Sequence, residues 1–310
     1  MPNEMLKNVI NISNRTFSPK FISSFKKVLK RLYGYESYMD FLIVPSVLNK
    51  KTLSYIPLVN YTDRCSNDVK DLLELGKENE FQIRALNFDY TDFKKNDTVT
   101  MRIETKNQSS ENLFANSVKS RCRNKIRNSI KKYDFTLKYG NDSQSIDDFY
   151  KIFSKTMHKH GTPVFDKNLF TSLVDEFKND IIFYNAFDKG KVISSMCIMI
   201  DGSLAWYPWG GVDTEYSKKL AGYFIYWKTL QHVCDTRRIE IFDFGRSSYG
   251  GSTYKFKSQF GAKPTKIDIL TSNEVDIYSK YSLASKIWKK LPKKIVDFIG
   301  PKLCKYLVDL

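Results

Sequence analysis

The sequence has few cysteines and histidines and no long apolar run, and each shortage excludes a class of protein. Its five cysteines are odd in number, scattered and never in C-x-x-C spacing, which argues against a disulfide framework and a zinc site. His158 and His160 are two residues apart on an expected helix and point to different faces, so we expect no metal site. Without an apolar run of about eighteen residues or a secretory signal in residues 1–10, we expect a cytoplasmic protein.

Motifs of covalent catalysis are also missing. The sequence contains no G-x-S-x-G elbow and no persuasive Cys–His pairing. Acyl transfer to an amine needs no covalent intermediate, because it requires only orientation of the partners, removal of a proton from the amine and stabilisation of the oxyanion. We therefore expect any acyl transfer by this chain to proceed by direct attack of the amine.

Positive charge is plentiful. Fifty Lys and Arg residues against 34 Asp and Glu give the 310-residue chain a formal charge of +16. A field of this size favours polyanions such as tRNA, nucleotide diphosphates or anionic lipid surfaces. A lysine-rich surface that serves only solubility is the alternative interpretation.

From residue 135 onward the hydrophobic periodicity predicts a regular succession of elements. Short Asp-Gly and Asp-Lys-Gly-Lys turns between apolar runs indicate hairpins in the middle of this region. The expected elements are a strand at 135–140, helices at 145–160 and 166–178, strands at 181–187, 192–200 and 203–209, a helix at 217–234, a strand at 239–245, a short helix at 253–262 and a strand at 265–270.

The first hundred residues are less regular and echo the same unit. The step into 81–88 is similar to the step into the strand at 239–245, which suggests a shortened duplicate of the later half. The polar residues 107–111 mark a junction. The expected elements here are a helix near 18–33, strands near 39–44 and 53–59 and a helix near 67–79.

A strongly basic helix is expected after the junction. Val118, Cys122, Ile126 and Ile130 recur every four residues, and no acidic residue lies among them. The basic face is expected to bind the phosphates of tRNA or of a nucleotide-linked sugar, and a merely solvated face is the alternative. The residues expected to bind phosphate are Arg121, Arg123, Lys125, Arg127 and Lys131.

The segment 239–264 has the density of features typical of a site. A buried-strand pattern ends at Gly245, where the chain must turn, and a short basic and aromatic helix follows. Gly250 and Gly251 allow close approach of the backbone to a ligand. If Asp243 faces inward it must be paired, and Arg246 is the nearest partner in the sequence.

This segment, FDFGR followed by Y-x-F-K-x-x-F-G-A, resembles the C-terminal signature of the FemAB-like family, the peptidoglycan-bridge aminoacyltransferases and their relatives in envelope-polysaccharide and exosortase-associated gene sets. Residues 119–140, 149–170, 206–211 and, more faintly, 53–63 resemble the family in the same order. The family has the GNAT acyltransferase fold, and the order of elements after residue 135 is the GNAT order.

The resemblance implies an α/β (α+β) protein of two GNAT-like domains, each a mixed, mainly antiparallel sheet flanked by helices. The expected divisions are an abbreviated N-terminal domain at 1–110, the basic connecting helix at 111–134, a catalytic domain at 135–274 and a basic amphipathic helical tail at 275–310. The tail interleaves apolar residues with lysines, a pattern that suits the surface of an anionic bilayer. Docking of the tail onto the body of the protein is the alternative.

The resemblance also implies roles for individual residues. Lys257 matches the family motif and is expected to stabilise negative charge on the acyl ester or leaving group, although Lys255 lies on the same short helix. Asp243 is expected to position the acceptor amine or Arg246. The expected substrate contacts are Arg246, Tyr254, Trp206, Trp209, Gly250 and Gly251, with ordinary core positions the alternative for the aromatic residues.

The donor is expected to be aminoacyl-tRNA. Acyl-CoA enzymes of this fold carry Q/R-x-x-G-x-G/A before the central helix, where the chain has Lys219 to Phe224, and the bulky Phe224 is expected to obstruct the pyrophosphate site. We expect no permanently bound cofactor. The predicted function is amide formation on an amine of a nucleotide- or lipid-linked envelope precursor, with peripheral contact at the inner face of the membrane. The alternatives are an acyl-CoA N-acyltransferase acting on an amino sugar of a surface polysaccharide and a non-catalytic module that binds tRNA or membrane.

Overall fold

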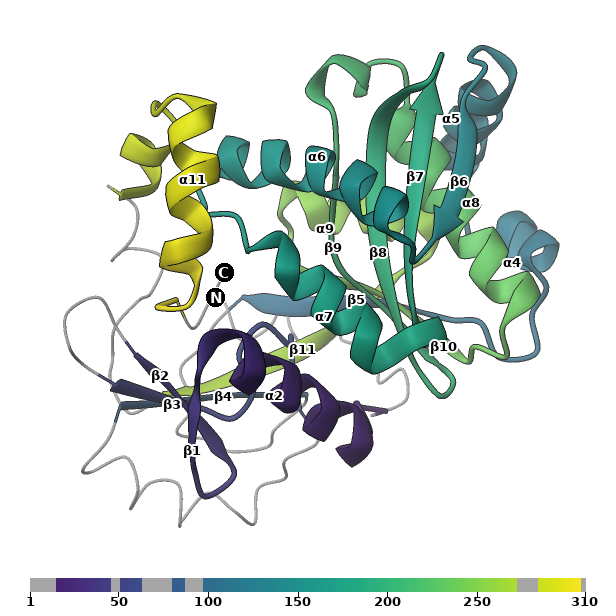
Figure 1. Cartoon of the computed structure of the whole chain (residues 1–310). Helices are drawn as coiled ribbons and strands as arrows, with labels where there is room; N and C mark the ends of the chain where they lie inside the picture. The colour runs from purple at the N-terminus through teal and green to yellow at the C-terminus, as the bar shows by residue number, and fades with distance from the viewer. Residues whose placement is uncertain (1–14, 46–50, 63–79, 87–96, 272–283, 308–310) are drawn as a thin grey trace.

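The computed structural model describes residues 15–45, 51–62, 80–86, 97–271 and 284–307 (Figure 1). The strands are β1 (Glu36–Tyr38), β2 (Phe41–Pro45), β3 (Lys51–Ser54), β4 (Glu80–Leu86), β5 (Thr98–Glu104), β6 (Thr136–Gly140), β7 (Ile181–Asp188), β8 (Lys191–Asp201), β9 (Leu204–Val212), β10 (Ile241–Ser248) and β11 (Lys263–Thr271). They form one eleven-stranded sheet in the order β1-β2-β3-β4-β11-β5-β10-β9-β8-β7-β6. Most neighbours are antiparallel, whereas β3 with β4 and β9 with β10 are parallel.

Helices cover both faces of this sheet. Alternate residues of β7 show why: Ile181 and Phe183 pack on one side, and Ile182 and Tyr184 pack on the other. Residues of α2, α6 and α7 complete the first core, and residues of α4, α5 and α8 complete the second. The helices are α2 (Pro19–Tyr33), α4 (Ser110–Asn116), α5 (Ser120–Lys131), α6 (Ser143–His160), α7 (Lys167–Phe177), α8 (Ala221–Thr236), α9 (Ser252–Lys257) and α11 (Lys293–Cys304).

The ends of α6 are set by local sequence. The side chain of Asp142 accepts a hydrogen bond from the backbone N–H of Ser145 and so caps the N-terminus. Gly161 ends the helix in the left-handed conformation, with a φ of 74°. A longer side chain at Gly161 would collide with Ser285 of the C-terminal segment. The helix therefore ends where the C-terminal segment crosses it.

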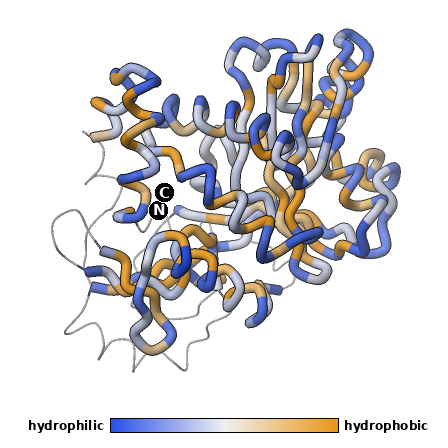
Figure 2. The backbone as a smooth tube through the Cα atoms, in the orientation of Figure 1, coloured by the Kyte–Doolittle hydropathy of each residue, from blue (hydrophilic) through white to orange (hydrophobic). Residues whose placement is uncertain are grey.

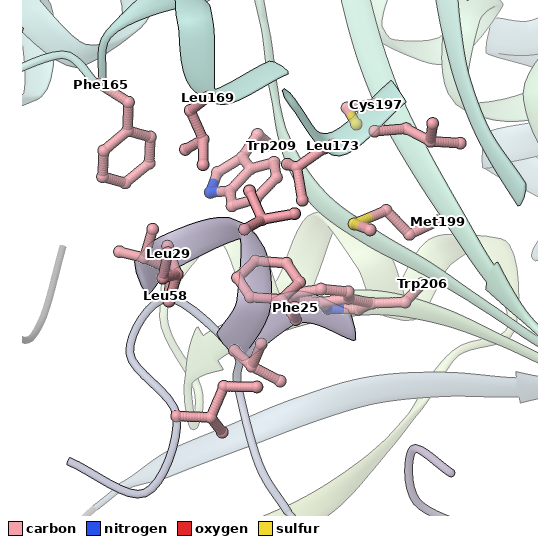
Figure 3. Packing of buried hydrophobic residues seen from close by; sticks show 14 of the residues in the cluster. Phe25, Leu29, Leu58, Phe165, Leu169, Leu173, Cys197, Met199, Trp206 and Trp209 are labelled. Atoms are coloured by element: carbon pink, nitrogen blue, oxygen red, sulfur yellow. The ribbon is translucent and has the colours of Figure 1, made fainter. Parts of the chain in front are cut away.

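One core joins the N-terminal and C-terminal parts of the chain. Phe25 of α2 is fully buried, and its ring lies 6.4 Å from that of Trp209 in β9 and 6.2 Å from that of Phe177 in α7. Figure 3 shows Phe25 and Leu29 of α2 among residues from α7, β8 and β9. Removal of either part would expose a large apolar surface.

The sheet is also shared between the two parts. β5 lies before residue 110 in the sequence, yet it sits between β10 and β11. The first half of β11 pairs with β5, and its second half pairs with β4. The division expected at residue 110 therefore does not divide the sheet.

Most of the expected elements are present, with specific differences. The α/β class and the order of elements expected after residue 135 are confirmed. The strand expected near 53–59 ends at Ser54, and α8 begins at Ala221 rather than near 217. Ile130, expected on the apolar side of the basic helix, is 43% exposed. The helix expected near 67–79 lies outside the described residues.

The described part of the C-terminal tail docks on the body of the protein. Val296, Gly300 and Cys304 are buried, and the Cys304 Sγ lies 3.0 Å from the carbonyl oxygen of Val164. The Tyr35 hydroxyl donates a hydrogen bond to the carbonyl of Lys305 at 2.7 Å. Within the described part of the chain, every helix is too short or too polar to cross a membrane.

Candidate active site

The strands β9 and β10 separate from one another after a short parallel pairing. They are paired from Leu204 with Ile241 to Trp206 with Asp243, although both strands continue for several residues. A cavity of about 450 Å³ lies between the separated ends. Its walls are residues 207–212, Phe244, Gly245 and Arg246 from the two strands, Thr253 and Lys257 from α9, Leu58 and Asn60 from the N-terminal part, Thr156, Lys159 and His160 from α6, and Ser217 and Tyr226.

Gly245 is the point at which β10 turns away. The register of β10 against β5 shifts between Asp243 and Arg246, as at a β-bulge. Gly245 has a φ of +77°, and a Cβ atom there would lie 2.6 Å from the carbonyl oxygen of Tyr207. Only glycine fits this position. The bulge thus brings the backbone of β10 close to the wall formed by β9.

Two of the residues expected to be catalytic hold this glycine from opposite sides. The backbone N–H of Gly245 donates to Asp243 Oδ1 at 2.7 Å. The carbonyl oxygen of Gly245 accepts a hydrogen bond from Lys257 Nζ at 3.0 Å. Asp243 and Lys257 are therefore linked through one residue, with Lys257 lining the cavity and Asp243 behind its wall.

Asp243 is fully buried and is satisfied by protein donors. Besides Gly245, its carboxylate accepts hydrogen bonds from the Tyr61 hydroxyl at 2.7 Å, the Thr100 hydroxyl at 2.5 Å and Arg102 Nε at 2.9 Å. Burial is the main cause that raises the pKa of Tyr61 well above its ordinary value, so this phenol remains a donor. Asp243 therefore positions the bulge rather than a substrate.

The expected pairing of Asp243 with Arg246 is wrong. The ion-pair partner is Arg102, which is also fully buried. β5 runs antiparallel to β10, so Arg102 lies directly opposite Asp243, whereas Arg246 lies beyond the bulge in the wall of the cavity. Arg246 was predicted as the partner because it is close to Asp243 in the sequence, whereas the pairing of β5 with β10 places Arg102 against Asp243.

The N-terminal part supplies residues that the sequence interpretation missed. Tyr61 and Asn60 lie in a loop that follows β3, just beyond the end of the strand expected near 53–59. With its amide turned so that both of its ends are satisfied, Asn60 would accept hydrogen bonds through its side-chain oxygen from the backbone N–H of Arg246 at 3.3 Å and from Trp206 Nε1 at 3.1 Å. This loop therefore holds the bulge from the side opposite α9. The available signal for β5 was TVTMRIE, a run of β-branched and apolar residues around one arginine.

Lys257 is buried at the edge of the cavity, with 4% of its surface exposed. Its Nζ donates hydrogen bonds to the carbonyl oxygens of Gly245 at 3.0 Å and Arg246 at 2.7 Å. Burial lowers the pKa of Lys257 to about 7, with Asp243 acting against the shift and the charge of Arg246 adding to it. Lys257 therefore exchanges its proton near neutral pH. Lys255, its rival in the sequence, is exposed on the same helix.

The remaining expected substrate contacts divide into two groups. Arg246 and Trp209 line the cavity, whereas Trp206 is fully buried in the core behind it. Three others, Tyr254, Gly250 and Gly251, lie outside the cavity wall. The ring of Tyr254 packs 5.0 Å from that of Tyr249.

Basic side chains line the cavity. Lys159, His160, Arg246 and Lys257 line it, and no Asp or Glu is present among its described walls. Burial lowers the pKa of His160, and the charges of Lys159 and Lys289 lower it further. A cavity with this lining suits a ligand that brings its own negative charge.

Comparison with known families identifies the fold. Residues 116–257 match the family model of the acetyltransferase (GNAT) domain. The protein therefore has a GNAT fold, and the matched domain spans less than half of its 310 residues. No curated protein sequence matches this chain.

Solved structures of similar fold cover most of the chain. FemX is 13% identical with a TM-score of 0.54, over 92% of this chain and 98% of its own. The C-terminal domain of a protein described as a lysylphosphatidylglycerol synthetase from Agrobacterium fabrum is 11% identical with a TM-score of 0.53, over 86% and 95%. L-PGS from Bacillus licheniformis is 8% identical with a TM-score of 0.53, over 90% and 100%. The FemAB-like GNAT fold expected from the sequence is confirmed.

Phe224, near the N-terminus of α8, does not line the cavity. Phe224 is buried in the second core, where its ring lies 5.6 Å from that of Phe135, and it is not part of the cavity wall. The bulk of Phe224 therefore lies in the core, and the choice of donor stays a prediction. A Cβ atom added at Gly222 would lie 3.5 Å from Cγ2 of Val212, which lines the cavity.

The basic helix α5 combines structural and exposed cations. Arg123 donates to the carbonyl oxygens of Ala115 and Val118, and so closes the end of α4. The remaining residues expected to bind phosphate, Arg121, Lys125, Arg127 and Lys131, are all exposed. Lys125 also donates a hydrogen bond to the Tyr223 hydroxyl at 2.9 Å, and the guanidinium of Arg127 lies over the ring of Phe114. No cluster of three metal-ligating side chains occurs in the described part of the acyltransferase.

Replacement of Asp243 by asparagine is expected to destabilise the acyltransferase. The change would leave the buried guanidinium of Arg102 without its counter-charge, which costs about 3–5 kcal/mol. Urea denaturation would measure the free energy of unfolding. Asp147→Asn is the matched control, because Asp147 pairs with Lys167 at the surface and its loss should cost less than about 1 kcal/mol. Equal losses in the two variants would contradict the role assigned to Asp243.

The pKa of Lys257 predicts a dependence of stability on pH. Between pH 7 and 10.5 the unfolded chain keeps the proton that the folded chain releases, so stability rises with pH across this window. The slope due to Lys257 is at most about 1.4 kcal/mol per pH unit. Urea denaturation of wild type and Lys257→Met should show the wild type gaining on the variant as pH rises from 7 to 10.

A matched variant separates burial from loss of charge in this experiment. Lys255→Met removes a positive charge from the exposed side of the same helix. Its stability difference from the wild type should stay nearly constant across the pH range. A constant difference for Lys257→Met as well would show that the pKa of Lys257 is not lowered.

Proposed function

We propose that this acyltransferase transfers an aminoacyl group from an activated ester to an amine of a cell-envelope precursor. The observation that carries the proposal is the position of Lys257, buried at the edge of a cavity between two separated strands and near neutrality in its pKa. An amide-forming site needs a proton donor or cation at the point where negative charge develops. Lys257 is the buried lysine of the cavity wall.

The reaction we propose needs no covalent enzyme intermediate. The acceptor nitrogen attacks the acyl carbonyl carbon, the C–N bond forms, and the bond to the leaving oxygen breaks. The amine loses a proton and the leaving oxygen gains one. Protonated Lys257 donates a hydrogen bond to the developing oxyanion or leaving oxygen, and the Gly245 and Arg246 carbonyls hold its Nζ in place.

The basic helix supports a tRNA-linked donor. Lys125 of α5 contacts Tyr223 of α8, and Gly222 beside it lies against Val212 in the cavity wall. Phosphates bound along α5 would therefore lead toward the cavity. One protein of similar fold is described as a lysylphosphatidylglycerol synthetase, and this adds support for an aminoacyl donor.

The lining of the cavity supports an anionic acceptor. Lys159 offers positive charge and His160 offers hydrogen bonds, and no carboxylate is among the described walls of the cavity. Envelope precursors that are linked to a nucleotide or a lipid carry phosphate groups, and these fit such a lining.

An acyl-CoA donor is the second candidate, because one observation favours it. Phe224 is buried in the second core and is not part of the cavity wall, so its side chain does not occupy the cavity. In this alternative the leaving atom is sulfur, and the same residues would act on a thioester.

The choice of donor can be tested directly. The protein would be incubated with a total tRNA preparation charged with labelled amino acids, and separately with labelled acetyl-CoA, each with and without an amine acceptor. We expect acceptor-dependent consumption of charged tRNA, weakened by Arg121→Glu with Lys131→Glu and by added salt. Lys290→Glu with Lys294→Glu is the control of equal charge change. Consumption of acetyl-CoA alone would contradict the tRNA donor and support the second candidate.

Lys257 should carry a pH-dependent share of catalysis. Loss of one oxyanion donor costs about 10²–10³ in rate, so Lys257→Met should lower kcat/KM by that factor near neutral pH. The ratio of kcat/KM between wild type and Lys257→Met should fall as pH rises above about 7, because Lys257 loses its proton there. Taking the ratio cancels the ionisation of the acceptor amine, which both proteins share.

Two further variants make this result specific. Lys255→Met should keep full activity, and Lys257→Arg, which stays protonated, should show no loss of its residual rate in the same pH range. A ratio that rises with pH would show that Lys257 acts as a base and would contradict the cationic role. An unchanged rate in Lys257→Met would remove Lys257 from the proposed mechanism.

A further inference from the structure

The C-terminal segment presents an apolar surface to solvent although it is docked on the body of the protein. Phe298 of α11 is 68% exposed, Ile295 is 42% exposed, and Ile287 just before the helix is 55% exposed. Val296 and Gly300 lie on the opposite side of α11 and are buried. The helix therefore has two apolar sides, of which only one is buried against the described part of the chain. Figure 2 shows hydrophobic and hydrophilic segments alternating along α11.

Lysines alternate with the exposed apolar residues along the sequence. The described residues 284–307 contain seven lysines and one acidic residue, Asp297, which is already bonded to Lys293. The Nζ of Lys302 lies 3.8 Å from the ring centroid of Phe298. We call the following set the tail face: Ile287, Ile295 and Phe298 with the exposed lysines Lys286, Lys290, Lys294 and Lys302.

We propose that the tail face docks on an anionic membrane surface. Apolar side chains next to cations match the two layers of a bilayer surface. The apolar side chains enter the acyl boundary, while the ammonium groups stay among the anionic headgroups. A nucleic acid would use the lysines and leave Phe298 in water. The charge of the face thus selects an anionic partner, and its apolar centre selects a lipid.

The tail face is held at a fixed position relative to the cavity. The Ser285 hydroxyl donates a hydrogen bond to the carbonyl of His160, and His160 and Lys159 line the cavity. Figure 1 shows α11 beside the C-terminal end of α6. Docking would therefore hold the cavity near the bilayer surface, within reach of a lipid-linked acceptor. This consequence rests on the proposed function, whereas docking itself does not.

Vesicle co-sedimentation of the full chain, without donor or acceptor, tests the proposal. Vesicles would consist of phosphatidylcholine alone or of phosphatidylcholine mixed with phosphatidylglycerol. We expect binding to the mixed vesicles only, weakened by salt. Lys290→Glu with Lys294→Glu should reduce binding by about tenfold or more, and Phe298→Ser should reduce it severalfold.

Matched controls separate the tail face from the high net charge of the chain. Lys131→Glu with Lys132→Glu makes the same charge change on α5, and Met39→Ser removes another apolar side chain that is 75% exposed. Both controls should bind as the wild type does. Near-neutral effects of Phe298→Ser, or equal losses in the controls, would overturn the proposal. So would a dimer in sedimentation equilibrium that Phe298→Ser breaks, because the face would then join two copies of the chain.

Failure of this proposal is distinguishable from failure of the proposed function. Acyl transfer to a water-soluble acceptor should continue in Phe298→Ser, because Phe298 serves docking and not the transfer itself. Vesicle binding would continue in Lys257→Met, because Lys257 lies in the cavity wall and not on the tail face.

Discussion

The buried carboxylate of Asp243 is the interaction on which the site depends. A charge removed from water is very costly unless donors surround it, and this one is met by Arg102, Tyr61, Thr100 and the N–H of Gly245. These donors come from a loop, from β5 and from β10 itself. Because all of these groups donate to one carboxylate, they fix the bulge in β10. The bulge in turn presents two carbonyl oxygens to Lys257.

The position of Lys257 follows from this arrangement. Its Nζ is removed from water but not from hydrogen bonding, so burial lowers the pKa while the two carbonyls fix the atom in space. A group fixed before the reaction begins loses little free energy to reorganisation when charge develops beside it. The separation of β9 and β10 supplies the space for that charge, and the cationic walls match it.

The sequence predicted the local features of this site better than its long-range ones. The strand before Gly245, the short helix with Lys257 and the succession of elements after residue 135 follow from periodicity, turn residues and a family motif, all of which are local. The partner of Asp243 was mistaken, because Arg102 becomes its neighbour only through pairing of β5 with β10. Local sequence carries no record of that pairing. Likewise, the direction of Phe224 depends on the packing of α8 against α5 and β6, which its motif position alone did not reveal.

The insertion of β5 between β10 and β11 has a consequence for how the chain is made. Residues 98–104 leave the ribosome before their neighbours at 241–248 and 263–266 exist. At ~5–20 residues per second, this interval lasts roughly ten seconds or more. During that time a strand with a buried arginine has neither of its partners in the sheet, and its unpaired edges invite association with other chains. Nascent copies of this protein should therefore rely on chaperones until the last third of the chain has been translated.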